Sequence, residues 1–478
     1  MKSNLKIIVL LVVGLLQYGC KTASVLPSNN TLSIPTQFLN EADTSMYGGS
    51  HALKEFFTDT HLLTLIEAAL VNNPDQKIAL QRVEAARASL RMGRGALLPA
   101  LGATVAVGQQ RFGQYTMDGV GNFDTNFSPN IEADQRMAEH LPDYYTALQS
   151  SWEIDLWGKL RNQKRAAAAK LLATNYGKQL VTTLLVAEIA SAYYDLLALD
   201  NELEIIEKNI QLQERALEVV KAQKEAGRAT ELAVKQFTAQ LFNTRNLLVR
   251  VKQRIFAAEA GINFLSGRFN QPIVRAQPIL LQPLPSTLNA GVPAQMLKRR
   301  PDVLQAEALL QATHFNVAAA RAAFLPSLNI TATWGLQSFN PDKWLNPASL
   351  TYGIFGGLTA PVFYRNQLKA DLQRANAEQQ EAFFQYQKSI LLGYQEVIVN
   401  LNQMHTLEEA AQFKQQEVVA LNEGVAASYD LYIAGMASYL EVITAQKSVL
   451  EAELQLAETR KVQFVTAINL YRALGGGW

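Results

Sequence analysis

The sequence predicts an α+β membrane protein in which four β-strands per chain contribute to a barrel shared between chains, continued by very long α-helices. Three observations predict this fold. The chain contains two internal repeats. Each repeat has two segments of alternating apolar and polar residues, and each has a run of more than 60 residues without proline.

The internal repeat is visible at two sequence offsets. At an offset of 227, the residues Pro74, Asp75, Arg94, Ala96, Leu98, Pro99 and Leu101 return as Pro301, Asp302, Arg321, Ala323, Leu325, Pro326 and Leu328. At an offset of 208, the residues Gly227, Ala229, Leu232 and Val234 return as Gly435, Ala437, Leu440 and Val442. We attribute the 19-residue difference to one loop, because residues 113–142 are longer than their counterpart at 339–349.

The N-terminus is typical of an export signal. Lys2 and Lys6 precede an apolar stretch, and Gly19 is followed by Cys20, the only cysteine. We predict a signal peptide at 1–19, lipid modification of Cys20 and a lipid-anchored extension at 20–60. Gln17 departs from this pattern, because lipoprotein signals usually carry Leu there. An incidental or buried cysteine is the alternative.

The remaining chain divides into two repeats, 61–269 and 293–478, joined by a proline-containing linker at 270–292. Each repeat is expected to contain a helix, two strands and a long helical hairpin. The strands are predicted near 97–110 and 144–157, and near 326–338 and 350–363. The hairpin tips are predicted near Gly227 and Gly435.

The predicted strands alternate between an apolar and a polar face. In the second strand, Leu148, Trp152, Ile154 and Leu156 oppose Gln149, Ser151, Glu153 and Asp155. A transmembrane barrel strand needs this pattern, with lipid on one side and a water-filled lumen on the other. A half-buried strand of a soluble sheet alternates in the same way, but the signal sequence and the aromatic residues near the strand ends favour the membrane.

The proline-free runs predict helices from about Lys159 to Ala226 and from about Gln367 to Ile433, each about 100 Å long at 1.5 Å per residue. Return helices follow at about 230–266 and 438–474, and helices at about 74–97 and 293–324 are expected to complete the upper stretch. Four strands cannot close a transmembrane barrel alone, so several chains must share one. A coiled-coil scaffold without a pore is the rival interpretation.

Composition argues against other functions. The chain has 43 basic and 42 acidic side chains, a net charge of +1, so no strong field attracts nucleic acid. The five histidines have no metal-ligand spacing, and no catalytic or phosphate-binding motif occurs. We therefore predict no cofactor, no metal site and no enzymatic activity.

Five short motifs follow one another along the chain: Trp157-Gly158-Lys159-Leu160-Arg161, Arg299-Arg300-Pro301-Asp302-Val303, Phe324-Leu325-Pro326-Ser327, Pro361-Val362-Phe363 and Tyr432-Ile433-Ala434-Gly435. In this order and spacing they resemble the TolC-like outer membrane factors of tripartite efflux systems, in particular their lipoprotein branch. The resemblance implies a homotrimer with a twelve-stranded barrel in the outer membrane of a Gram-negative bacterium, in contact with outer-membrane lipid. It also implies two protein partners, a periplasmic adaptor and an inner-membrane pump of the RND type. The expected function is passive efflux of small hydrophobic or amphiphilic compounds, and protein secretion is the alternative within this class.

The resemblance also suggests where function resides. The adaptor is expected at the tips, at Gly227, Ala229, Thr230, Gly435, Ala437 and Ser438. The aperture is expected at Tyr432 and Glu441, with Asp430 as a weaker candidate. Three Glu441 carboxylates near one axis would repel one another and bind cations. The acidic lock is incomplete, because Ala233 and Thr444 occupy its other positions.

Plainer interpretations stand beside these. Glycine ends helices because it accepts a positive φ, and Glu441 is equally typical of a solvated helix residue. Glu153 and Asp155 are expected to face the pore, either tuning ion preference or keeping the pore wet. Arg299-Arg300-Pro301-Asp302 is typical of ordinary helix initiation.

Overall fold

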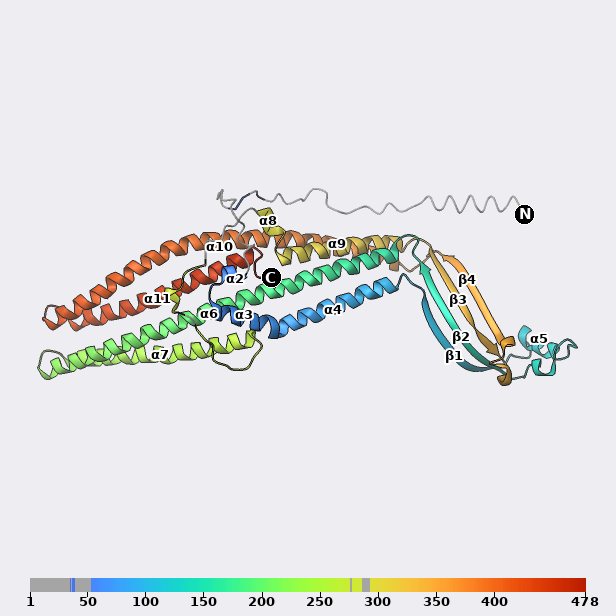
Figure 1. Ribbon diagram of the computed structural model, residues 1–478, viewed down its shortest axis with the longest axis horizontal. Coiled ribbons are helices and arrows are strands. Elements are labelled where there is room, and N and C mark those ends of the chain that lie inside the picture. Colours follow the sequence, from blue (N-terminus) through green and yellow to red (C-terminus); the bar gives the residue numbers. More distant parts are fainter. Residues whose placement is uncertain (1–34, 36, 39–52, 276, 286–292) are drawn as a thin grey trace.

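The protein is an elongated column of helices that continues into a four-stranded antiparallel sheet (Figure 1). The computed structural model describes residues 35, 37–38, 53–275, 277–285 and 293–478. The predicted signal peptide, Cys20 and most of the 20–60 extension lie outside the described residues.

The two repeats have the same element order and matching helix lengths, which confirms the predicted internal repeat. The long helices α6 and α10 each have 67 residues, the return helices α7 and α11 each have 35, and α4 and α9 each have 22. The first repeat consists of α4 (Pro74–Gly95), β1 (Ala100–Gln110), β2 (Leu141–Ile154), α6 (Lys159–Glu225) and α7 (Glu231–Leu265). The second consists of α9 (Pro301–Ala322), β3 (Ser327–Ser338), β4 (Leu350–Thr359), α10 (Gln367–Ile433) and α11 (Tyr439–Ala473).

Short elements decorate this frame. They are α2 (Leu53–Phe56), α3 (Thr60–Asn72), α5 (Met117–Thr125) and α8 (Pro293–Leu297), with 3-10 turns at Ala133–Gln135, Ile279–Leu281, Pro341–Lys343 and Pro347–Ser349. Helix α5 lies in the long loop between β1 and β2, at the end of the sheet farthest from the helices (Figure 1).

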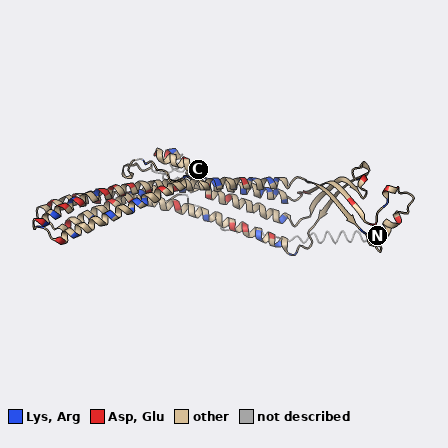
Figure 2. Ribbon diagram, turned by 90° about the horizontal axis from the view of Figure 1, so that it is seen from below, with Lys and Arg blue, Asp and Glu red and all other residues tan. Residues whose placement is uncertain are grey.

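The sheet has the order β1-β2-β3-β4, so β1 and β4 are its edges. Neighbouring strands are antiparallel, with Gly102 opposite Gln149, Trp152 opposite Ile330 and Trp334 opposite Tyr352. Strands β1, β3 and β4 contain no charged residue. Strand β2 has two, Asp143 and Glu153, and most other charged residues of the described chain lie along the helices and loops (Figure 2), as expected for strands that contact lipid.

Two predicted strand ends were wrong. Strand β2 ends at Ile154 rather than near 157, because the next residues form the turn that starts α6. Strand β4 ends at Thr359 rather than near 363, because Pro361 has no N–H to donate to the ladder.

Two predicted helix limits were also wrong. Helix α4 ends at Gly95, since the backbone N–H groups of Leu97 and Leu98 already bond in turns, and β1 starts only at Ala100. The helix expected from 293 to 324 is broken into α8 and α9, because Pro301 cannot continue a helix and begins a new one instead.

Helices α4 and α9 complete the columns above the shorter return helices. Helix α4 starts where α7 ends, and Asn73 Nδ2 donates to Leu265 O at 2.9 Å. The main apolar core lies at this mid-height level, where Tyr194 stacks on Phe464 and Phe56 stacks on Tyr471, both with ring centroids 4.2 Å apart. One 18-residue window of α6 is apolar enough by composition to cross a membrane, and 56% of it is buried inside the protein, as in the core helix of a bundle.

Candidate functional site at the hairpin tips

The two tips reverse the long helices by the same backbone motif. Gly227 and Gly435 take φ values of 72° and 79°, in the left-handed region. The next residue donates its N–H back to a carbonyl of the last helical turn, Arg228 to Gln223 and Met436 to Leu431, both at 2.8 Å. A Cβ on either glycine would meet nothing within 4 Å. The glycines are therefore needed for backbone conformation and leave open space around the tips.

The two return helices start differently. Thr230 Oγ1 accepts from the N–H of Ala233 at 3.2 Å. In the second tip, Glu441 occupies the equivalent of Ala233, and its carboxylate accepts from the backbone N–H of Ser438. This reciprocal arrangement is a capping box. Glu441 thus has a local structural role that the sequence analysis did not predict, and its side chain remains exposed.

An apolar cluster joins the two hairpins just behind the tips, and we call it the tip cluster. Its buried members are Ala216, Leu217, Val220, Ala233, Val234, Phe237, Leu241 and Val442. Val442 comes from α11 and the others from α6 and α7, so the cluster bridges the two repeats. Ala233, fully buried at 0% exposure, is one of its central residues.

Tyr432 packs against the edge of the tip cluster with Tyr429 and Tyr439. Its hydroxyl is buried and has no hydrogen-bond partner among the described residues. Burial raises the pKa of the Tyr432 phenol. A buried polar atom without a partner is uncommon, and the Tyr432 hydroxyl is one of ten such side-chain atoms among the described residues. Asp430, two residues before Tyr432 on α10, is exposed.

The surfaces of the two tips have different chemistry. At the α6–α7 tip, Glu231 forms ion pairs with Lys224 and Lys235, and these lower the pKa of its carboxyl. At the α10–α11 tip, the exposed residues are largely apolar: Leu431, Ile433, Met436 and Leu440. Ala229 and Ala437 are half-buried and Thr230 and Ser438 are exposed, so both tips combine small residues with an accessible backbone.

The residues predicted to face the pore lie near the junction of sheet and helices, and both are paired. Glu153 Oε1 is 2.6 Å from Lys159 Nζ. Asp155 accepts from the backbone N–H groups of Leu160 and Arg161, at 3.1 and 2.9 Å, and from Arg161 Nε at 3.1 Å. Its side chain is only 7% exposed. Asp155 therefore stabilises the start of α6 through these bonds.

Arg300 has a role that the sequence analysis missed. Pro301 and Asp302 open α9 as predicted, but the Arg300 guanidinium is buried at 5% exposure. It binds Asp302, Glu396 on α10 and the carbonyl of Ala473 at the end of α11. Burial disfavours its charged form, but Asp302 and Glu396 outweigh this and raise the pKa of Arg300. The only sequence signal was its position beside Pro301. That position does not distinguish a residue that links three helices from one that only precedes the start of a helix.

These features together define a class of protein. A four-stranded sheet with two open edges, continued by two helical hairpins, is one third of a trimeric twelve-stranded outer-membrane channel that extends into the periplasm. The outer membrane efflux protein family matches residues 65–268 and 292–476. The chain belongs to this family, whose members are homotrimeric channels working with periplasmic adaptors and inner-membrane RND pumps.

Individual relatives extend over nearly the whole chain. It is 28% identical to the cation efflux system protein CusC of Escherichia coli O6:H1, covering 98% of this chain and 97% of CusC. It is 31% identical to the toluene efflux pump outer membrane protein TtgF of Pseudomonas putida, covering 88% and 85%. A crystal structure of CusC superposes with a TM-score of 0.79 at 26% identity, covering 95% of this chain and all of that one.

Proposed function

We propose that this channel passively conducts small hydrophobic or amphiphilic compounds from the periplasm to the exterior, and that the adaptor opens it at the hairpin tips. We further propose that the chain has no catalytic activity and takes its driving force from the pump. The family supports an efflux channel, and the name of TtgF refers to a hydrophobic cargo, toluene. The apolar rim of the α10–α11 tip is compatible with such cargo.

The observation that carries the proposed gate is the environment of Tyr432. Its ring rests on the tip cluster, which joins the two hairpins, so a rotation of α10–α11 against α6–α7 must move it. Its hydroxyl lacks a hydrogen-bond partner among the described residues, and we propose that it finds one across the trimer interface in the closed state. Adaptor binding at the exposed tips would break that contact and widen the aperture.

Single-channel conductance tests this gate. Tyr432→Phe removes only the hydroxyl, and we expect it to raise the resting conductance of the purified trimer in a planar bilayer. Tyr439→Phe is the matched control, because Tyr439 borders the same cluster, and we expect it to conduct like the parent. Equal conductance of all three proteins would reject Tyr432 as the gate.

A cation cargo is the second candidate, favoured by the similarity to CusC and by the exposed Glu441, of which a trimer carries three. Complementation separates the two. In a host that lacks its own channel but holds the cognate adaptor and pump, restored tolerance to toluene and detergents supports the first proposal. Restored tolerance to metal salts alone supports the second.

Adaptor docking is tested separately. Met436→Glu and Arg228→Glu change the exposed side chains that follow Gly435 and Gly227, so the glycine turns and the tip cluster stay intact. We expect both variants to form trimers but to lose co-purification with the adaptor. Normal adaptor capture by both would place the docking site elsewhere.

A further inference from the structure

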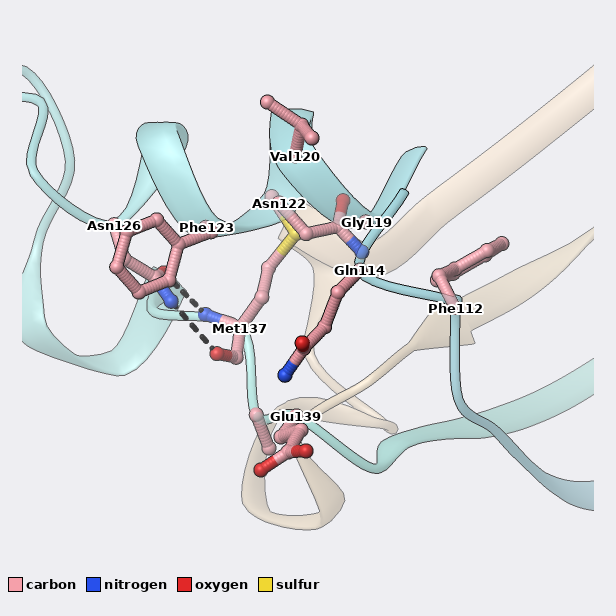
Figure 3. A pocket seen from close by; sticks show the side chains of 10 residues that line it. Phe112, Gln114, Gly119, Val120, Asn122, Phe123, Asn126, Met137 and Glu139 are labelled. Carbon is pink, nitrogen blue, oxygen red and sulfur yellow. Dashed lines mark hydrogen bonds between the residues drawn. The ribbon is translucent and has the colours of Figure 1, made fainter. Parts of the chain in front are cut away.

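The long loop between β1 and β2 has an apolar surface that the channel function does not explain. Helix α5 presents Val120 and Phe123 on one face, and Phe123 packs edge-on against Phe127 with centroids 5.0 Å apart. All three are more than half exposed. Two hydrogen bonds between Asn126 and Met137, of 2.9 and 2.8 Å, hold α5 against the returning chain (Figure 3).

This loop contains a groove with a volume of about 570 Å³. Phe112, Val120, Phe123 and Met137 supply its apolar lining (Figure 3). The volume exceeds that of one aliphatic side chain, and the groove is open on one side. Contiguous apolar surface in water is generally covered by a partner.

The order of the strands indicates which partner lies closest. Strands β1 and β4 are the free edges of the sheet, and closure of the trimeric barrel pairs β1 of one protomer with β4 of the next. Gln110 ends β1 and Leu350 begins β4 at the same, outer end of the sheet. The chain that follows Gln110 therefore lies beside the β3–β4 loop of the neighbouring protomer, residues 339–349.

The β3–β4 loop offers a matching projection. Its own protomer holds one side of it, through the ion pair of Asp134 with Lys343 at 2.9 Å and the contact of Tyr144 with Trp344 at 5.4 Å between centroids. Leu345, next to these two residues, is left 75% exposed. Leu345 is therefore a large, exposed apolar side chain on a loop that these two contacts hold against its own protomer.

We propose that the α5 groove receives Leu345 of the neighbouring protomer, so that three identical clasps join the subunits around the channel exit. The trimer interface then continues beyond the barrel seam into the extracellular loops. In this arrangement the longer β1–β2 loop supplies the groove of the clasp. The shorter β3–β4 loop supplies the side chain, Leu345, that enters it.

Site-specific cross-linking tests the clasp in the full-length protein in whole cells. Phe123→Cys and Leu345→Cys are carried on separate chains with different affinity tags, co-expressed and treated with a short bis-maleimide. We expect a covalent dimer that carries both tags. A chain carrying both substitutions should give covalent trimers, and the parent chain, which keeps Cys20, should give none.

The matched control is Asp118→Cys combined with Leu345→Cys, because Asp118 lies on the face of α5 opposite Phe123 at 100° per residue. We expect it to cross-link far less. Three results would overturn the proposal: no cross-link between the two tagged chains, a cross-link confined to single chains, or equal yields with Asp118→Cys. Binding of an apolar molecule in the groove would appear as the first of these.

Discussion

Asn73 and Arg300 occupy equivalent positions in the two repeats and perform the same task with different chemistry. Asn73 Nδ2 donates to the carbonyl of Leu265 at 2.9 Å, and Arg300 Nη1 donates to the carbonyl of Ala473 at 3.0 Å. Each acceptor is the last residue of a return helix. Each donor immediately precedes the proline that opens the helix above, so both satisfy a helix end at the joint of two columns.

The second joint is reinforced by charge. Arg300 also binds Glu396 Oε2 at 2.7 Å, and the other oxygen of Glu396 accepts from Arg472 at 3.1 Å. The network therefore ties α9, α10 and α11 together at the level where the column changes helices. A cation near the end of α11 also complements the negative pole of that helix.

Replacing Arg300 by Met should destabilise the helical column strongly. The change leaves Asp302 and the Ala473 carbonyl without their donor, and breaking a buried ion pair from one side typically costs about 3–5 kcal/mol. Thermal unfolding of the detergent-solubilised trimer by circular dichroism measures this. Lys298→Met is the control, because Lys298 is exposed on the same segment. Equal unfolding temperatures for both variants would show that the Arg300 network contributes little.

Two substitutions of Glu441 distinguish a role in capping α11 from a role in ion passage through the aperture. Its carboxylate accepts from the Ser438 N–H, and the amide oxygen of Gln can also accept that bond, whereas Ala cannot. If charge controls ion passage, Glu441→Gln and Glu441→Ala should both lower the preference for cations in single-channel recordings. If the residue only caps α11, Glu441→Gln should behave like the parent and only Glu441→Ala should lose stability. The equivalent change Ala233→Glu should be far more damaging, because Ala233 is fully buried in the tip cluster.

Asp155 should make the start of α6 sensitive to acid. Burial alone would raise the pKa of its carboxyl, but the bonds from Arg161 and Leu160 outweigh this and leave the pKa below its ordinary value. Such a group stabilises the folded protein above the unfolded-state pKa of about 3.9, and this contribution is lost as the pH falls through the lower folded-state pKa.

The expected result for Asp155→Asn is lower stability at neutral pH and a flatter loss of stability with falling pH than in the parent. Asp155→Ala also removes the acceptor and should cost about 1–3 kcal/mol, because two N–H groups at the helix start lose their partner. Thermal unfolding at a series of pH values below neutral measures both. Parallel pH profiles for Asp155→Asn and the parent would contradict the role assigned to this carboxylate.

The architecture was predictable because its signals are long and repeated. The proline-free runs located α6 and α10 to within one residue, and the alternating segments located all four strands. The ends of the strands were harder to predict from the sequence. Asp155, which binds the start of α6, happens to continue the alternation of apolar and polar residues beyond the end of β2. The partner of Arg300 lies 96 residues away on another helix, a separation at which no local pattern operates. For the same reason, the tip cluster that supports Tyr432 could not be derived from residues near Tyr432.

Gly335 should be indispensable for the sheet, whereas Gly357 on the adjacent strand should not be. A Cβ on Gly335 would lie 2.2 Å from the carbonyl oxygen of Thr146 and 2.5 Å from the Cα of Ala147, its partner across the ladder, while a Cβ on Gly357 would meet nothing within 4 Å. Both contacts of Gly335 are with backbone, so rotation of a side chain cannot relieve them, and β2 and β3 must separate.

Separation within the membrane leaves backbone groups without hydrogen bonds, which lipid cannot replace. We therefore expect Gly335→Ala to lose the trimer in the outer-membrane fraction, as assessed by heat-dependent migration on denaturing gels. Gly357→Ala should retain it at the level of the parent. A normal trimer for Gly335→Ala would mean that β2 and β3 pair less closely in the assembled barrel than in the single chain, and loss of trimer in both variants would mean that the strands tolerate no added methyl group at all.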